Sequence, residues 1–499
     1  MTRLQRITNI LLILLLSLTA GLYIFANLFH YTAYMESDVG AEAVYGMVLA
    51  GNNCLPPDTW VSSTENRIVS MPNLAAPIYK LCGNMNLSAG IACSLLILLL
   101  ILCMVRFYAY VGYGSTGILT ACLTPFILSA WNIAGLKMFA LYACYYSPHI
   151  ITLFLLMTAY ARLLREKRIR IPSTILLAIL SWLLGMQGLR GLAMVYLPLC
   201  AVEFLRLVTL VLIKLHDRNK EKKIPLLIPL WLLALSAINY IAARIYAPFG
   251  EDTSSNFRKG IFKLFGTAIP ETYELIRANG LATIVAIILL LLAVIGWWAI
   301  IRQIKSKPEI IAVSTILLSL ILAMLAASFT TLDSTPRYYI MVVFAIAAGC
   351  GALASFMDRK LTAILVIFVT LLSVISISHA YAALIANDNT LNSTEYAMVS
   401  DLESKGYTHG YATFDYAMML TTYSNGHLII APIQMDTMEP ALWLTDTRWY
   451  PPTTDPNEGY FIVTTEATTP VLQTTLDSKG LTDYSIATYG QYSVFFFQP

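Results

Sequence analysis

An acidic cluster lies directly after the first apolar segment of the chain, with Glu36, Asp38 and Glu42 in close succession. A carboxylate at the boundary between water and lipid, partly shielded by loop residues, can act as a general base. It would take the proton from an acceptor hydroxyl group as that group attacks. The alternative is ordinary solvated charge beside a membrane segment, which is the commoner case for an acidic triplet. On the sequence alone the triplet is a candidate site, and no one of the three carboxylates is assigned as the base.

Further along the same loop, the stretch that begins at Trp60 contains Glu65 and ends in Arg67. An arginine here can hold a phosphate, because its planar guanidinium group matches the oxygens of a phosphate. Tryptophan favours the membrane interface. Glu65 could instead simply neutralise Arg67, and the stretch alone does not decide between the two interpretations.

Three more cations, Lys137, Arg190 and Arg337, lie at the ends of apolar segments that would face the exterior of the cell. Basic residues are less expected at that side of a membrane. One interpretation has them converge on an anionic lipid headgroup. In the other, each side chain reaches separately to nearby lipid phosphates, which is the commoner behaviour of a single residue. Arg337 is the strongest candidate, because Pro336 fixes the chain just where a segment begins.

The composition indicates which class of protein must position these residues. The chain has 499 residues, of which 58% are hydrophobic and only 12% charged, about half the charged share of a soluble protein. This excludes a soluble globular enzyme and a disordered chain. The net charge of +3, with basic residues spread over loops, does not indicate a nucleic-acid partner. We therefore predict an all-α polytopic membrane protein in contact with membrane lipids.

Eleven apolar segments are long enough to cross a bilayer core of about 30 Å as helices. They lie near residues 7–29, 87–105, 117–135, 138–161, 172–188, 191–213, 224–247, 280–301, 309–329, 338–356 and 361–383. With the N-terminus in the cytoplasm, most lysines and arginines fall in short cytoplasmic loops, as the positive-inside rule requires. An odd number of segments then places the C-terminus outside.

The composition divides the chain into two parts. Residues 1–383 form the predicted transmembrane domain, with exterior loops at 30–86 and 248–279. Residues 384–499 contain no further apolar segment and are rich in Asp and Glu, which predicts a small exterior α/β domain. Strands are expected at 410–414, 427–431, 460–464 and 493–497, and helices at 393–405 and 467–479.

Cys54 and Cys82 are the only cysteines outside the apolar segments. An oxidising exterior would allow a disulfide between them, and two free thiols fit the sequence equally well. The sequence contains no Walker loop, GxSxG, HExxH or dinucleotide fingerprint. We expect no organic cofactor and leave open whether a divalent metal is bound.

This layout resembles the GT-C superfamily of integral-membrane glycosyltransferases, which includes protein mannosyltransferases and aminoarabinose transferases. The residues that carry the resemblance are Ser37-Asp38 with Glu42, the stretch 60–67, Gly188-Leu189-Arg190-Gly191 and Arg337-Tyr338-Tyr339. The tail segment 410–417 is similar to the tails of uncharacterised bacterial members. One departure is Val39, since several well-studied members have a glutamate directly after the aspartate.

The resemblance implies a glycosyltransferase in the plasma membrane of a bacterial cell envelope, acting on its exterior face. The donor would be a polyprenyl-phosphate-linked sugar, and the acceptor a glycan, lipid or protein. Asp38 would be the general base, helped by Glu42. The residues expected to hold the donor phosphate are Arg337, Arg190, Arg67 and Lys137. Those expected to contact the acceptor or the sugar are Glu65, Trp60, Asp415 and Trp443.

A different class of protein is the alternative, namely a secondary transporter or lipid flippase with an accessory exterior domain. That class favours charges near the middle of the bilayer and broken helices in repeated halves. Here the charges of interest gather at the exterior boundary, and no internal repeat is visible. A non-catalytic scaffold for envelope assembly is a third interpretation.

Overall fold

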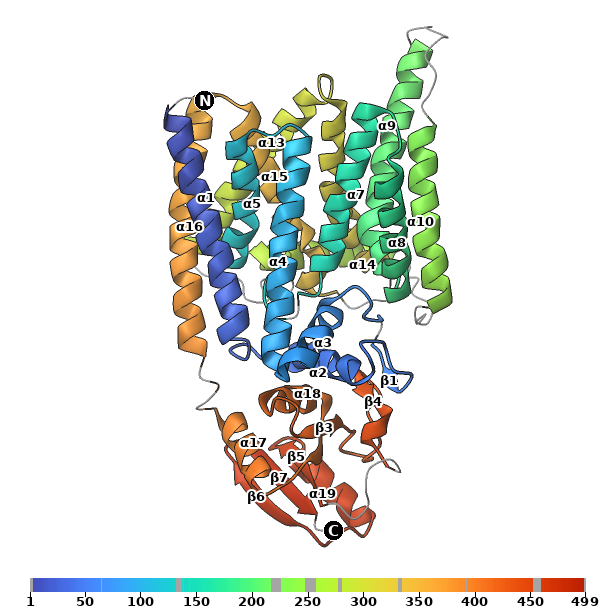
Figure 1. Cartoon of the computed structure of the whole chain (residues 1–499), viewed down its shortest axis with the longest axis vertical. Coiled ribbons are helices and arrows are strands. Elements are labelled where there is room, and N and C mark those ends of the chain that lie inside the picture. The colour runs from blue at the N-terminus through green and yellow to red at the C-terminus, as the bar shows by residue number, and fades with distance from the viewer. Residues whose placement is uncertain are drawn as a thin grey trace.

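The computed structural model describes residues 3–497 except 64, 132–136, 138, 143, 217–225, 247–256, 277–280, 331–333, 389, 391–392 and 452–458. Parts of the second predicted loop, 248–279, therefore lie outside the described residues. A bundle of helices carries a smaller domain at one end, and helix α1 begins at the opposite end (Figure 1).

Eleven helices of the described chain match the eleven predicted segments. Nine of these are long and apolar enough to cross a membrane, and α5 and α8 are shorter apolar helices. The eleven are α1 (Arg3–Phe29), α4 (Met85–Tyr110), α5 (Ser115–Ser129), α7 (Ser147–Glu166), α8 (Ile171–Gln187), α9 (Leu197–His216), α10 (Leu227–Tyr246), α13 (Leu281–Gln303), α14 (Ser314–Phe329), α15 (Met341–Phe356) and α16 (Arg359–Asn387). Short turns lead into three of them, namely η1 (Leu192–Tyr196) into α9, η3 (Pro308–Val313) into α14 and η4 (Pro336–Tyr339) into α15. Between α10 and α13 lie α11 (Phe257–Lys263), η2 (Leu264–Ala268) and α12 (Ile269–Ile276).

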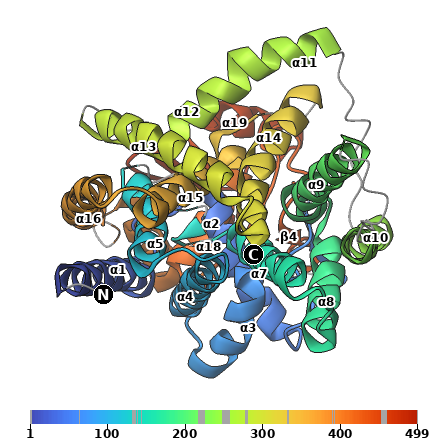
Figure 2. The same cartoon turned by 90° about the horizontal axis from the view of Figure 1, so that it is seen from above.

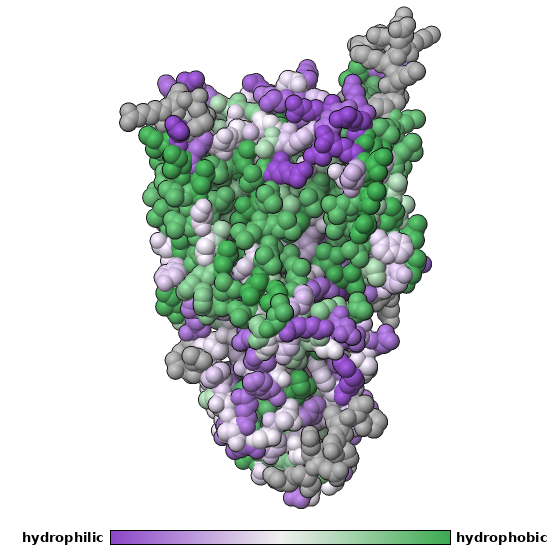
Figure 3. All heavy atoms as spheres, viewed as in Figure 1, coloured by the Kyte–Doolittle hydropathy of each residue, from purple (hydrophilic) through white to green (hydrophobic). Residues whose placement is uncertain are grey.

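An apolar belt crosses the face of the bundle seen in Figure 3, and polar side chains gather at both ends of that face. Within the apolar stretch of α15, 89% of the residues are buried, against 33% in α1 and in α16. Helix α15 therefore lies at the centre, whereas α1 and α16 lie at the rim (Figure 2). Helices suit this setting because a backbone in lipid must satisfy its own hydrogen bonds.

The predicted segment 138–161 is helical only in part, because α7 begins at Ser147. Tyr142 and Cys144 have positive φ angles of 57° and 48°, which a right-handed helix does not accept. Asn27 of α1 holds this turn. Its side chain donates to the carbonyl of Ala140 (3.3 Å) and accepts from the amide of Tyr142 (2.9 Å). Tyr145 and Tyr146 therefore lie at the end of this turn, directly before Ser147, the first residue of α7.

The first predicted loop contains regular structure, namely α2 (Ser37–Gly51), β1 (Trp60–Val61) and α3 (Met71–Cys82). Cys54 and Cys82 are free thiols, so the disulfide that the sequence allowed is not formed. Cys82 is the last residue of α3, and its Sγ lies 3.2 Å from the Oγ of Ser88 in α4. Its thiol therefore packs against α4 instead of pairing with Cys54.

The smaller domain is built on a five-stranded sheet with the strand order β3-β2-β5-β7-β6. Its elements are α17 (Thr394–Ser404), β2 (His409–Ala412), α18 (Phe414–Tyr423), β3 (Ile429–Pro432), β5 (Tyr460–Thr465), α19 (Thr469–Ser478), β6 (Ser485–Tyr489) and β7 (Tyr492–Phe497). Strand β2 is parallel to β3 and β5, and β7 is antiparallel to β5 and β6. The four expected strands and two expected helices are confirmed, while β6 and α18 are additional.

Helix α2 joins the bundle to the smaller domain. The Ser37 hydroxyl donates to the carbonyl of Asp415 (2.6 Å) at the start of α18. Gly40 lies so close to α18 that a Cβ would be 2.7 Å from the carbonyl oxygen of Met418. Nearby, β1 pairs antiparallel with β4 (Thr445–Asp446). These contacts fix the smaller domain against the first loop.

Replacing Gly40 by alanine should loosen this docking. The new methyl group would press on backbone atoms of α18, and overpacking of this kind costs about 1–3 kcal/mol, partly offset by alanine's better helix propensity. We expect a lower thermal unfolding temperature and faster proteolysis between α16 and α17. Gly51→Ala in the same helix is the control, because a Cβ there meets nothing within 4 Å. Equal behaviour of the two variants would contradict the tight α2–α18 contact.

Candidate active site

A cavity with about 510 Å³ of space, part of which is open solvent, lies where the helical bundle meets the smaller domain. Residues from the first loop, from the ends of several membrane helices and from the smaller domain form its walls. They are Asp38, Ser63, Glu65, Arg67, Tyr145, Tyr146, Arg190, Arg337, Tyr338, Trp443 and Leu444. Six of the twelve residues singled out from the sequence are among them.

Asp38 and Arg337 form an ion pair in this cavity. Asp38 lies in the first turn of α2, and its Oδ2 is 3.0 Å from a terminal guanidinium nitrogen of Arg337. Arg337 lies in η4, where Pro336 occupies the first turn just before α15. The Tyr145 hydroxyl donates to the backbone carbonyl of Asp38 (3.0 Å) and fixes the start of α2. Both charged side chains remain about one-third exposed (34% and 39%), so a ligand can reach them.

A second set of charges forms a chain behind this pair. Glu42, one turn after Asp38 on α2, is buried and bonds to Arg67. Arg67 also approaches Glu65 (3.6 Å), and Glu65 forms an ion pair with Arg190, whose Nε lies 2.8 Å from a carboxylate oxygen. The three carboxylates of the site are thus each bound to at least one arginine.

Burial governs the charges of Glu42 and Arg67. Removal from water raises the pKa of the Glu42 carboxyl, and the positive charge of Arg67 offsets only part of this rise. Burial by itself lowers the pKa of the Arg67 guanidinium, but the negative charge of Glu42 outweighs it, and the pKa lies above the usual value. Arg67 therefore stays charged, and its guanidinium is committed to its carboxylates.

The guanidinium groups of two arginines lie over tyrosine rings. The guanidinium of Arg67 lies 5.1 Å from the ring centre of Tyr145. That of Arg190 lies 5.0 Å from the ring of Tyr146 and 5.9 Å from the ring of Tyr338. Such contacts stabilise a cation without neutralising it. Tyr145 and Tyr146 were not predicted as cavity residues, since aromatic pairs in apolar segments usually belong to the core or to an interface belt.

Four predicted site residues do not line this cavity. Lys137 pairs with Glu36 (3.0 Å), outside the cavity wall. Trp60 is buried and stacks on Tyr45 with ring centres 4.5 Å apart, so it supports the fold of the loop. Asp415 is exposed, and Glu42 lies behind Arg67.

A metal ion in this cavity would need His, Cys, Asp or Glu side chains as ligands. Within the described ranges, no group of three or more His, Cys, Asp and Glu side chains could hold a metal ion. The cavity carboxylates of Asp38 and Glu65 instead form ion pairs with arginines. Three guanidinium groups converge here, which suits an anionic ligand.

The comparisons with known proteins agree with this architecture. The sequence matches no model of a protein family and no curated protein. Two solved structures of ArnT from Cupriavidus metallidurans resemble the chain, and each comparison covers 97% of both chains. ArnT bound to undecaprenyl phosphate is 13% identical with a TM-score of 0.56, and apo ArnT is 12% identical with a TM-score of 0.57. The chain therefore has a GT-C-like fold, with a small sheet region at its C-terminal end.

Removing the cation from the buried pair should destabilise the protein in a pH-dependent way. Arg67→Gln leaves the Glu42 carboxylate buried without its partner, which costs about 3–5 kcal/mol. Because burial raises the pKa of Glu42, the penalty is present above that pKa and declines as the pH falls through it and the carboxyl takes a proton. Thermal unfolding of the detergent-solubilised protein between pH 5 and 8 measures the effect.

The double variant Glu42→Gln, Arg67→Gln is the matched control, because it removes both charges together. We expect it to unfold at a higher temperature than Arg67→Gln at pH 8, with little dependence on pH. A single variant whose loss of stability is the same at pH 5 and pH 8 would contradict the pairing.

Proposed function

We propose that the protein is a membrane glycosyltransferase that moves a sugar from a polyprenyl-phosphate donor to a hydroxyl group on the exterior face. The observation that carries this proposal is the Asp38–Arg337 pair in an arginine-lined cavity at the end of the membrane bundle. The GT-C-like fold supports it, and so does the undecaprenyl phosphate bound to the similar ArnT structure. Orientation towards the exterior rests on the positive-inside pattern.

The donor phosphate would bind to Arg337 and Arg190. Both lie at the ends of membrane helices, which is the depth at which a lipid-linked phosphate is held while its chain stays in the bilayer. Glu65 and the rings of Tyr146 and Tyr338 fix the position of Arg190, so its remaining N–H donors are oriented before the ligand arrives. Arg67, bound by two carboxylates, would orient Glu65 and add positive charge behind the site of the donor phosphate.

Transfer would shift one unit of negative charge between two partners of Arg337. The acceptor hydroxyl attacks the anomeric carbon, its proton passes to a carboxylate oxygen of Asp38, and the bond from that carbon to the phosphate oxygen breaks. Asp38 then loses its negative charge while the leaving polyprenyl phosphate gains one. A guanidinium has five N–H donors, so Arg337 can bind both groups and stabilise the charge as it moves.

The acceptor would enter beside Trp443 and Leu444, which the smaller domain contributes to the cavity wall. Trp443 is 43% exposed, so its ring can cover a face of a sugar or another apolar surface of the acceptor. The acceptor class stays broad, as a glycan, a lipid or a protein with a free hydroxyl group.

Asp38→Asn should abolish transfer without abolishing donor binding. Loss of a general base lowers the rate by about 10²–10⁴-fold. A panel of undecaprenyl-phosphate sugars supplies the substrates, with release of undecaprenyl phosphate as the readout, and mass spectrometry of co-purified lipid reports binding. Arg337→Ala should lose both transfer and bound lipid.

Glu36→Gln is the matched control, because Glu36 lies two residues from Asp38 but outside the cavity wall. It should retain the activity of the unmodified protein. Full transfer by a well-expressed Asp38→Asn variant would overturn the proposed base. Unchanged movement of a substrate across the membrane in the same variant would favour a transporter instead.

Trp443→Ala should raise the KM for the acceptor about fivefold, because an aromatic contact contributes about 1 kcal/mol. The donor KM should change much less, since the ring belongs to the smaller domain whereas the donor phosphate would bind Arg337 and Arg190 of the helical bundle. Trp443→Phe, which keeps an aromatic face, should recover most of the acceptor affinity. A parallel rise in both KM values would indicate that the residue shapes the cavity as a whole.

A further inference from the structure

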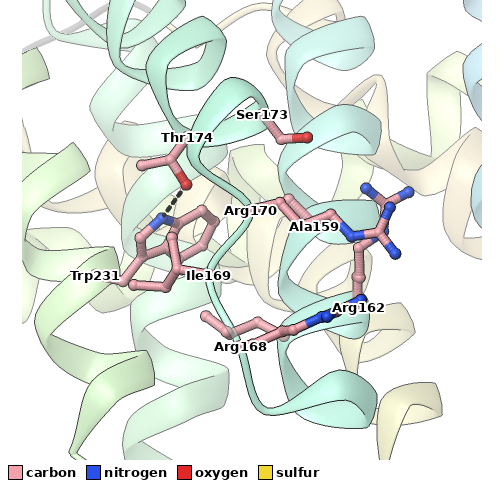
Figure 4. A pocket seen from close by; sticks show the side chains of 9 residues that line it. Ala159, Arg162, Arg168, Ile169, Arg170, Ser173, Thr174 and Trp231 are labelled. Carbon is pink, nitrogen blue, oxygen red and sulfur yellow. Dashed lines mark hydrogen bonds between the residues drawn. The ribbon is translucent and has the colours of Figure 1, made fainter.

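A second cavity lies at the other end of α7 and has about 290 Å³ of space, part of which is open solvent. Arg162 is 16 residues after Tyr146, which corresponds to about 24 Å along a helix. The cavity lies between α7, α8 and α10, and its polar walls are made by Arg162, Arg168, Arg170, Ser173 and Thr174. In Figure 4, the arginine side chains extend along one side, while Trp231 of α10 and Thr174 of α8 face them from the other. None of these residues takes part in the proposed transfer reaction.

Positive charge exceeds negative charge around this cavity. Five lysines and arginines occur between Arg162 and Arg170, with Glu166 as the single acid in that stretch. Glu166 binds Arg170 through two hydrogen bonds of 2.7 and 3.0 Å, and Arg168 approaches it at 3.6 Å. The charge of Glu166 is therefore committed to Arg170. The buried Nε of Arg162 has no hydrogen-bond partner among the described residues, while its guanidinium lies 5.6 Å from the ring centre of Tyr110.

The first turn of α8 adds backbone donors to the same wall. Its N-cap residue, Arg170, makes no side-chain capping bond, and Pro172 lies in the first turn. The N-terminus of a 17-residue helix carries a partial positive charge, which favours an anion nearby. The hydroxyl of Thr174 accepts from the indole of Trp231 (3.1 Å), which anchors α10 to this turn.

Apolar side chains on the outside of the same turn indicate what kind of anion fits. Ile169 lines the cavity, and Ile171 and Ile175 are 68% and 55% exposed on α8. On α10, Leu230 is 63% exposed beside Trp231. A molecule bound here would meet arginines with its phosphate and lipid-facing isoleucine and leucine side chains with its remainder. A free phosphate ion would use only the first of these surfaces.

We infer that this cavity binds the phosphate of an anionic phospholipid in the leaflet opposite the smaller domain. Arg162 and Arg168 hold the phosphate, Arg170 is fixed by Glu166 as part of the wall, and the acyl chains follow the outer faces of α8 and α10. Basic pockets between membrane helices on the cytoplasmic side suit such headgroups, and the positive-inside pattern assigns this end to the cytoplasm.

Native mass spectrometry of the full-length protein in dodecyl maltoside tests the inference. The protein is titrated with dioleoyl phosphatidylglycerol, with zwitterionic dioleoyl phosphatidylcholine and with inorganic phosphate. We expect preferential retention of phosphatidylglycerol, and at least a fivefold weaker apparent affinity in Arg162→Gln, Arg168→Gln. The double variant Arg359→Gln, Lys360→Gln is the control. It removes the same charge from the N-terminus of α16, at the same end of the bundle but on its far side (Figure 2).

Ser173→Asp provides a second variant that leaves every arginine in place. An aspartate in the first turn stabilises a helix, so the variant should fold, yet its charge would repel a phosphate in the cavity. It should show the same loss of phosphatidylglycerol. Equal retention of the two lipids, or equal losses in the cavity and control variants, would overturn the inference. Full displacement of the lipid by millimolar phosphate would overturn the lipid assignment in favour of a soluble anion.

Discussion

The pairing of charges at the edge of the membrane bundle is the constraint on which this structure depends. Removing an ion from water costs several kcal/mol, and only a close partner of opposite charge offsets that cost. Arg67 meets this requirement with Glu42, and Arg190 meets it with Glu65. Each partner comes from a different element, so the pairs fix α2, the loop before α3 and the turn before η1 relative to one another. The cavity has its shape because these elements cannot move apart without separating charges.

The same constraint explains why the site is polar yet enclosed. Tyrosine faces cover the guanidinium groups where carboxylates do not, and this leaves the charge of Arg190 undiminished. Asp38 and Arg337 form the pair that remains open to a ligand. One pair is thus accessible, while the more deeply buried Glu42 and Arg67 pair maintains the scaffold around it.

The sequence predicted the features that depend on local composition. All eleven apolar segments correspond to helices, because the thickness of a bilayer sets their length and hydropathy. Asp38, Glu65, Arg67, Arg190, Arg337 and Trp443 were singled out from the sequence and line one cavity. Asp38, Arg190 and Arg337 lie close to predicted segment ends, where a charged residue stands out in an apolar sequence.

Features that depend on distant partners could not be predicted. Asp38 and Arg337 are 299 positions apart, and nothing in either neighbourhood specifies the other. The turn before α7 has an apolar sequence that fits a helix, yet Asn27 of α1 holds it in another conformation. Trp60 was expected near a sugar, but it packs on Tyr45 inside the loop. Helices α2 and α3 lie in a segment rich in Pro, Asn and Ser, where their packing partners, not propensity, decide the structure.

The position of Trp443 and Leu444 has a consequence for the order in which the protein matures. They leave the ribosome long after Asp38, because they lie much later in the sequence. The wall of the cavity is therefore incomplete until the smaller domain has folded and paired β4 with β1. A chain that stalls before Trp443 would contain Asp38 and its neighbouring charges without the wall that Trp443 and Leu444 complete. The enclosed cavity is thus a late product of synthesis, although Asp38 is made early.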